Sequence, residues 1–219
     1  MAVGNWQPGP HSGEHFLATN ITTSGLPLAV LPLVELVSVN VAEPQIIGAF
    51  RGKPITSGIA KQPVTQDTLH LDWLNLAGDR QADLRVHGGR DKAVYAYPAE
   101  HIERWNAELT PETPYGPGTF GENLTTRGWL EDAVRIGDIW AWGDALLQVS
   151  EPRHPCFKLG MRTGRRDIIK RMETNGRSGW YLRVLQPGLV PVTGPIMVVS
   201  QALDAPTVLE TTGGAGGWR

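Results

Sequence analysis

The sequence predicts a mainly β protein whose strands close into a β-barrel that carries a few helices. Two observations lead to this fold class. Short runs of β-branched and aromatic residues recur between turn-forming residues, and their spacing is uneven, as in barrels with irregular connections. We expect seven or eight strands, drawn from residues 34–41, 55–64, 69–76, 93–97, 139–142, 146–150, 180–185 and 196–200.

The chain divides into one folded domain and two flanking segments. Residues 1–33 lack periodicity and carry Gly, Pro, Ser and Thr clusters, which predicts a loosely structured N-terminal extension. We expect the barrel domain at residues 34–203, since a chain of this length can bury one large core. Residues 204–219 end in a glycine-rich run, which predicts a flexible C-terminal tail.

Two helices are expected to interrupt the strands. Pro98 suits a first helical position, and the apolar residues of 99–109 repeat at three- and four-residue spacing, which places them on one face. The second helix is expected at about 166–174, with Ile168 and Met172 turned inward. Asn175-Gly176 follows it as a left-handed cap.

Charge and cysteine content exclude several classes of function. Twenty Lys and Arg against 22 Asp and Glu give a net charge of −2, so no overall field would gather nucleic acid or an anionic membrane. The chain has one cysteine, which excludes an internal disulfide and any all-thiolate metal site. A single thiol fits the reducing cytoplasm, which is the location we expect.

No targeting or membrane segment is expected. The first 16 residues lack a basic start followed by an apolar stretch, so a secretory signal is not predicted. Residues 26–41 are more apolar, but Pro27, Pro32 and Glu35 interrupt them well short of the roughly 20 residues that span a bilayer.

Two short motifs match known functional patterns, but the residues around them argue against those functions. Residues 11–15 have the H-x-x-E-H order of inverted zinc proteases, yet Pro8, Pro10 and Gly13 argue against the helix that this chemistry needs. Residues 116–121 match G-x-G-x-x-G, but no clear strand precedes them and no helix pattern follows. We expect a turn there.

One polar segment, residues 78–92, could build an anion site. Gly88-Gly89 allows backbone N–H groups to converge on an anion, and Arg90 and Lys92 lie close by. The alternative is a charged turn in which His87 only ties a loop together. The residues alone favour that alternative.

Two further polar segments complete the candidate site. Asn123, in residues 119–124, could bind a cofactor edge or a base through its amide, or could hold its own turn. Cys156 lies three residues after Arg153 and two before Lys158, so its thiolate could be stabilised as a metal ligand, nucleophile or sulfur carrier. The alternative is an inert core cysteine, and the residues alone leave both open.

Together these segments resemble the MOSC domain family, and within it the YiiM-like branch. The family motifs are TGIxKxPV, GDxQADxxVHGGxDKAVYAYP, FGENL, IGD, PRxPCxKL and GxYxRVL. They match residues 57–64, 78–98, 120–124, 136–138, 152–159 and 179–185, in this order. The resemblance covers about residues 36–202.

The resemblance implies a closed barrel similar to that of pyruvate kinase, with a pocket for a molybdopterin-type molybdenum cofactor. Cys156 matches the position of the molybdenum ligand or sulfur carrier, so it is the expected catalytic and metal-binding residue. The expected cofactor-binding residues are His87, Gly88, Gly89, Arg90, Asn123, Arg153 and Lys158. The association of this family with pyridoxal phosphate belongs to a separate domain of the sulfurases.

The resemblance also implies an oxidoreductase that reduces N-hydroxylated small molecules, such as hydroxylaminopurine bases, with electrons from a separate reductase. The alternative is a non-catalytic carrier of the cofactor or of sulfur. The chain departs from the family pattern at Ser57, where Thr is usual, and at Gly194-Pro195, where Gly-Asp is common. Only about 17 residues follow Ala202, whereas many YiiM-like proteins continue into a three-helix domain.

Overall fold

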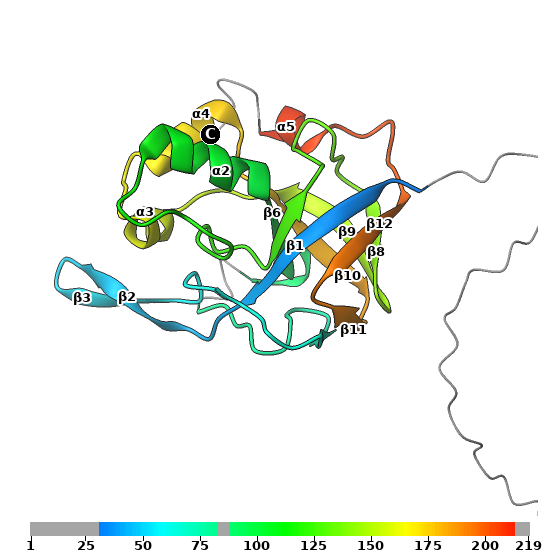
Figure 1. The fold of residues 1–219 in the computed structure, drawn as a ribbon, viewed down its shortest axis with the longest axis horizontal. Coiled ribbons are helices and arrows are strands. Elements are labelled where there is room, and N and C mark those ends of the chain that lie inside the picture. The colour runs from blue at the N-terminus through cyan, green and yellow to red at the C-terminus, as the bar shows by residue number, and fades with distance from the viewer. Residues whose placement is uncertain (1–30, 83–87, 213–219) are drawn as a thin grey trace, which may run out of the picture. The chain divides into compact units, whose positions relative to one another are not determined.

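The computed structural model describes residues 31–82 and 88–212, and a closed seven-stranded β-barrel forms its centre (Figure 1). The ring runs β12-β8-β9-β10-β6-β7-β1 and closes where β1 pairs with β12. Its strands are β1 (Leu33–Val41), β6 (Val94–Pro98), β7 (Leu124–Arg127), β8 (Ile139–Trp142), β9 (Ala145–Pro152), β10 (Trp180–Gln186) and β12 (Gly194–Ser200). The predicted fold class is therefore confirmed.

The ring is antiparallel except at one place. β6 and β7 pair in parallel, with Ala96 opposite Leu124. A parallel pair needs a crossover connection, and α2 (Ala99–Leu109) supplies it between the two strands. The remaining elements lie outside the ring: β2 (Gln45–Phe50), β3 (Lys53–Ser57), β4 (Gln62–Pro63), β5 (Thr68–Leu71), β11 (Gly188–Pro191), η1 (Arg90–Lys92), α3 (Phe157–Thr163), α4 (Ile168–Asn175) and α5 (Val208–Thr211).

Large side chains fill the barrel interior. Trp140, Trp142 and Trp180 are fully buried there together with branched residues of the other ring strands. The rings of Trp140 and Trp180 meet edge to face at 5.8 Å, and Trp142 Nε1 donates to the Pro191 carbonyl at 2.8 Å. The interior is thus a packed core rather than a space for a ligand.

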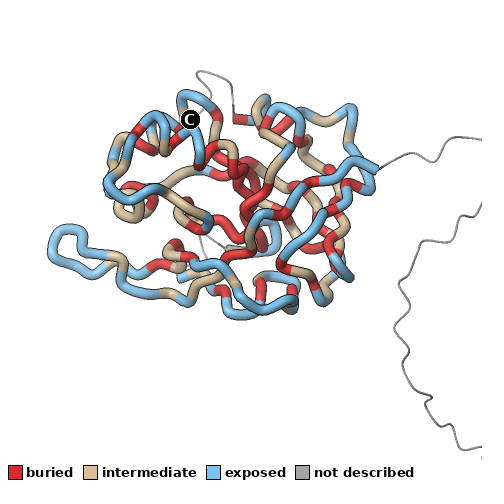
Figure 2. The backbone as a smooth tube through the Cα atoms, viewed as in Figure 1, coloured by how far each residue is buried: buried red, intermediate tan, exposed pale blue. Residues whose placement is uncertain are grey.

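A second core lies on the outer face of β6. Val94 and Ala96 point into the barrel, whereas Tyr95 and Tyr97 point outward and pack under α2, α3 and α4. All five residues of β6 are buried, which explains its unbroken apolar sequence. Figure 2 shows this double burial as a red segment between the ring and the helices.

Both predicted helices are present. α2 has the predicted bounds and buries Ile102, Trp105 and Leu109. The second spans Ile168–Asn175 and ends at Gly176, whose φ of 71° is the expected left-handed cap. None of the helices in the described ranges has the length and apolar character needed to cross a bilayer.

The structure corrects several predicted boundaries. The expected strand 55–64 is divided into β3 and β4, because the chain turns at Gly58, which packs against the Arg80 carbonyl and leaves no room for a Cβ. The expected strand 69–76 ends at Leu71. Part of the expected flexible tail is folded: α5 has a capping box between Thr207 and Glu210 and buries Val208. The predicted extension up to residue 30 lies outside the described residues.

Candidate functional site

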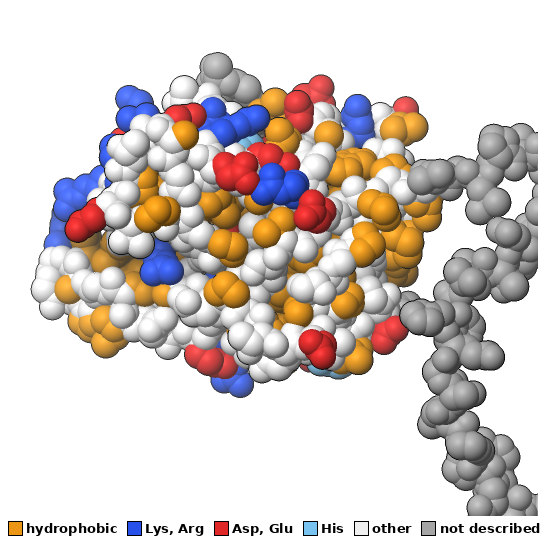
Figure 3. All heavy atoms as spheres, viewed as in Figure 1, with side chains coloured by type: hydrophobic (Ala, Val, Ile, Leu, Met, Phe, Trp, Pro, Cys, Tyr) orange, Lys and Arg blue, Asp and Glu red, His pale blue; other side chains and the backbone are white. Residues whose placement is uncertain are grey.

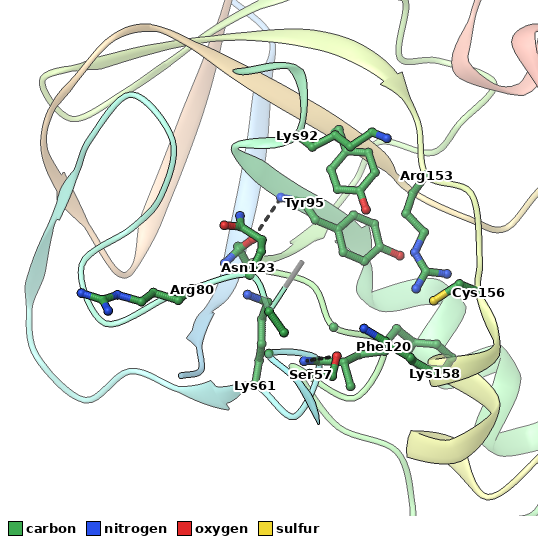
Figure 4. Close-up of a pocket in the computed structure, with 16 residues that line it drawn as sticks. Ser57, Lys61, Arg80, Lys92, Tyr95, Phe120, Asn123, Arg153, Cys156 and Lys158 are labelled. Atoms are coloured by element: carbon green, nitrogen blue, oxygen red, sulfur yellow. Dashed lines mark hydrogen bonds between the residues drawn. The ribbon is translucent and has the colours of Figure 1, made fainter. Parts of the chain in front are cut away.

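A pocket lies outside the barrel wall, where β6 and β10 meet the loops before α3 and after β3 (Figure 4). It contains about 620 Å³ of unfilled space, counted together with the open space at its mouth. The lining residues are Ser57, Gly58, Ile59, Lys61, Arg80, Gln81, Ala82, Lys92, Tyr95, Phe120, Gly121, Asn123, Arg153, Cys156, Lys158 and Tyr181.

Cys156 is one of the residues that line this pocket. It is the N-cap residue of α3, in extended backbone conformation, and its carbonyl accepts from Leu159 N at 2.9 Å. The thiol is half-buried, and Figure 4 shows its sulfur close to the guanidinium of Arg153. β9 ends at Pro152 just before this segment, so the barrel wall positions Arg153 and the short helix positions the thiol.

Arg153 is the most deeply buried cation in the lining, with 5% of its surface exposed. Its guanidinium carbon lies 5.4 Å from the centre of the Tyr95 ring. Its Nη1 is buried without a hydrogen-bond partner. Among the residues that the structure describes, no carboxylate forms an ion pair with it. An anionic ligand in the pocket could accept a hydrogen bond from this nitrogen and neutralise the buried charge.

Two tyrosines form the wall behind Arg153. Tyr95 and Tyr181 are opposite each other across β6 and β10, with ring centres 5.4 Å apart. Burial raises the pKa of both hydroxyls above their usual value, with the nearby Arg153 charge opposing the shift. Both therefore stay neutral near pH 7. The Tyr95 hydroxyl donates to the Ser178 carbonyl at 2.8 Å, whereas the Tyr181 side chain faces Arg153 and the Cys156 thiol.

A buried polar network closes the opposite wall. Lys61 Nζ forms an ion pair with Asp79 Oδ1, and Asp79 Oδ2 accepts from Asn123 Nδ2 at 2.9 Å. The Asn123 amide also accepts from Tyr95 N at 3.1 Å and donates to the Asn40 carbonyl at 3.2 Å. Burial lowers the pKa of Lys61, and the Asp79 charge opposes this. The Asn123 amide is thus committed to protein groups, so its part in the pocket is to hold this wall in place.

Residues 117–120 form a turn, as predicted for the G-x-G-x-x-G match, and Phe120 and Gly121 belong to the pocket lining. The turn folds around the buried carboxylate of Glu122. That carboxylate accepts from Gly118 N at 2.7 Å, Phe120 N at 3.0 Å and Thr125 Oγ1 at 2.9 Å. Burial raises the pKa of Glu122 to about 7, and these hydrogen bonds oppose the shift. Glu122 therefore shapes the pocket from behind.

The charged side chains of the lining are all basic. They are Lys61, Arg80, Lys92, Arg153 and Lys158. Arg80 points away from the pocket in Figure 4, whereas Lys92 stands beside the tyrosines, with Nζ 5.9 Å from the centre of the Tyr181 ring. Lys61, Arg80 and Lys92 are paired with Asp79, Glu43 and Glu151, which lie outside the lining. The positive charge that could attract an anion therefore comes mainly from Arg153 and Lys158.

The structure brings together four of the residues predicted for the site: Asn123, Arg153, Cys156 and Lys158. Gly88, Gly89 and Arg90 are not in the lining, and the Arg90 guanidinium lies over the Trp73 ring at 5.5 Å. His87 lies outside the described residues.

Three further lining residues, Lys61, Tyr95 and Tyr181, were not predicted from the sequence as site residues. Two features could have indicated them. One is a lone lysine between Ile59 and Pro63, and the other is polar-tipped tyrosines in otherwise apolar strands.

Within residues 31–82 and 88–212, no three His, Cys, Asp or Glu side chains are grouped to hold a metal ion. A metal at Cys156 would therefore take its other ligands from a cofactor.

Comparison with known proteins identifies the family. The MOSC domain model matches residues 83–197. Protein YiiM of Escherichia coli (strain K12) is 44% identical over 160 residues, which are 73% of this chain and 70% of that protein. The chain belongs to the MOSC domain family. The crystal structure of YiiM from Geobacillus stearothermophilus matches with a TM-score of 0.66 and 34% identity over 82% of both chains.

A third relative, from Gibberella moniliformis (strain M3125 / FGSC 7600), is named Reductase. It is 43% identical over 143 residues, which are 64% of this MOSC chain and 25% of that protein. The predicted family and its YiiM-like branch are thus confirmed.

Proposed function

We propose that this MOSC protein holds a molybdenum cofactor in the pocket and reduces N-hydroxylated small molecules, such as hydroxylaminopurine bases. One observation carries the proposal: Cys156 shares a pocket with Arg153, whose buried Nη1 has no hydrogen-bond partner, and the charged lining residues are all basic. The residues present fit a cofactor with phosphate and sulfur groups, because a thiolate suits a metal-sulfur centre and cations suit phosphate.

Three side chains would hold this cofactor. Cys156 would supply a protein ligand to molybdenum. Arg153 would donate to an anionic oxygen through its free Nη1, and Lys158 would add a second positive charge. When bound, the cofactor supplies two-electron redox chemistry that no side chain of this chain can perform.

The remaining lining residues would orient the substrate and move protons. Reduction of R–NHOH breaks the N–O bond and consumes two electrons and two protons, giving R–NH₂ and water. Tyr181, kept neutral by burial, would hydrogen-bond to the departing oxygen, while Tyr95 is committed to Ser178 and fixes the wall.

Electrons would come from a separate donor protein. The name of the relative from Gibberella moniliformis, Reductase, supports a reductive activity. The alternative, a non-catalytic carrier, also needs Cys156, so loss of function in a Cys156→Ser variant does not discriminate between the two.

Turnover does discriminate between them. Protein expressed with ample molybdenum should contain molybdenum and pterin, and with reduced methyl viologen it should convert 6-N-hydroxylaminopurine to adenine. Cys156→Ser should lose turnover and bound molybdenum, whereas Ser150→Ala, on β9 outside the pocket lining, removes a hydroxyl that donates to the Asp91 carbonyl and should keep both. Stoichiometric molybdenum without turnover would contradict the reductase and favour the carrier.

A further inference from the structure

Two segments beside the pocket carry positive charge only. Residues 44–66 and 152–166 contain eight of the 20 Lys and Arg of the chain and none of its 22 Asp and Glu. The chain as a whole has a net charge of −2, so this is a strong local asymmetry. The first segment includes the β2–β3 hairpin and the second includes α3, and both contribute residues to the pocket.

The hairpin tip and the start of α3 form one surface with an apolar centre. The rings of Phe50 and Phe157 lie 6.1 Å apart, although their side chains are 55% and 51% exposed. The Arg51 guanidinium lies 5.4 Å from the centre of the Phe50 ring, and Lys53 is opposite Phe50 in the strand register. We call Phe50, Arg51, Lys53, Phe157 and Lys158 the tip patch. Exposed aromatics surrounded by cations are typical of a protein-binding surface.

The tip patch adjoins the pocket. Phe157 and Lys158 directly follow Cys156, and Lys158 itself lines the pocket. The hairpin is also braced against α3, since a Cβ at Gly48 would lie 2.8 Å from the Met161 methyl. Figure 1 shows the hairpin extending beside α3, and Figure 3 shows hydrophobic and basic side chains together on this side. A protein seated here would lie next to the Cys156 thiol.

We propose that the tip patch is the docking surface for an acidic electron-donor protein that reduces the centre in the pocket. This inference rests on the proposed function, which needs electrons delivered close to Cys156. Electron-transfer encounters are small and transient, and they rely on opposite charges for rapid association, which matches a compact basic surface.

Charge also argues against a second copy of this chain as the occupant. A two-fold symmetric contact would bring the same patch of both copies together, and this would crowd the patch cations of one copy against those of the other. Like charges in contact destabilise an interface. An acidic partner removes this repulsion and covers the two exposed rings.

A charge-reversal experiment on the cofactor-loaded full chain tests the proposal. Arg51→Asp/Lys53→Glu reverses two patch cations outside the pocket, and Asp tolerates the positive φ of 50° at position 51. Arg104→Glu/Lys170→Glu is the matched control, with the same change in net charge at two exposed helix positions outside the patch. Turnover is measured with reduced flavodoxin, an acidic one-electron carrier, and with reduced methyl viologen. Calorimetry measures the binding of oxidised flavodoxin.

The patch variant should raise the KM and Kd for flavodoxin about tenfold and flatten their salt dependence, while viologen-driven turnover stays unchanged. The control should resemble the native protein in every assay. Equal flavodoxin parameters in both variants, with viologen turnover intact, would overturn the docking proposal alone. Absence of viologen turnover in the native loaded protein would overturn the proposed function and this inference with it. A native dimer that the patch variant dissociates would assign the surface to a second copy instead.

Discussion

Replacing Arg153 by methionine should raise the free energy of unfolding of this protein and at the same time weaken its binding of an anion. Arg153 is 5% exposed, its Nη1 has no hydrogen-bond partner, and no described carboxylate forms an ion pair with it. Desolvating such an ion costs several kcal/mol, and stacking on Tyr95 returns only about 0.5–2 kcal/mol. Methionine fills a similar volume without a charge. We therefore expect the cofactor-free variant to be more stable than the native protein by about 1–3 kcal/mol.

The same change should weaken cofactor binding. A charge-assisted hydrogen bond contributes about 1.5–3 kcal/mol, so its loss lowers affinity about 10- to 150-fold. Urea unfolding of cofactor-free protein gives the first quantity, and molybdenum retained after dialysis gives the second. Arg153→Lys serves as the control, because it keeps the positive charge but lacks the planar guanidinium with its several N–H donors. A methionine variant that is less stable by more than about 1 kcal/mol and retains molybdenum normally would refute the reasoning.

Three further predictions concern the walls of the pocket. Burial raises the pKa of Glu122 from 4.5 to about 7, so the stability from its neutral form is complete below about pH 4.5 and is lost as pH rises through about 7. Glu122→Gln should flatten this decline, which amounts to at most about 3 kcal/mol in urea unfolding, and an unchanged pH profile would contradict the assignment. Lys61→Met leaves the Asp79 charge buried without its cation and should cost about 3–5 kcal/mol. Lys61→Met/Asp79→Asn should recover most of that loss, whereas additive losses would show that the pair is not coupled. Gly179→Ala should destabilise the fold by about 3 kcal/mol or more, because its φ is 68° and a Cβ would meet the carbonyl of Ala96; a loss under about 1 kcal/mol would be inconsistent with that contact.

Local periodicity was sufficient to predict the elements whose pattern of buried and exposed residues matches the order of apolar and polar residues in the sequence. α2 has the predicted bounds because its apolar residues recur on one helical face, and β8, β10 and β12 begin and end within two residues of the prediction. β2 was missed, and with it the β2–β3 hairpin, because nearly all side chains of β2 are exposed and so follow no burial pattern. β7 was missed because it is a four-residue strand, Leu-Thr-Thr-Arg, that exists through its neighbours in the ring.

The same distinction applies to the pocket. Cys156, Arg153 and Lys158 lie within six residues of one another, so the sequence could group them. Tyr95 and Tyr181 are 86 positions apart and become neighbours only through the register of β6 and β10. Asn123 could be predicted as a pocket residue, but its hydrogen bonds to Tyr95 and Asp79 depend on three separate segments. Tertiary pairing, which a single sequence does not reveal, therefore decides what each group does.

Because the pocket lies outside the barrel, the two cores have different roles. The barrel interior is filled by tryptophans and branched side chains, so it can contribute rigidity but no space for a ligand. β6 connects the rigid barrel to the pocket. Its alternate residues pack in both cores, and its residue Tyr95 forms part of the pocket wall. The groups suited to chemistry, Arg153 and Cys156, come from the loop that leaves β9, where neither core determines the residue type. Substitutions inside the barrel should therefore lower the free energy of unfolding more than they affect activity. Substitutions of Arg153 or Cys156 in this loop should abolish activity while the protein stays folded.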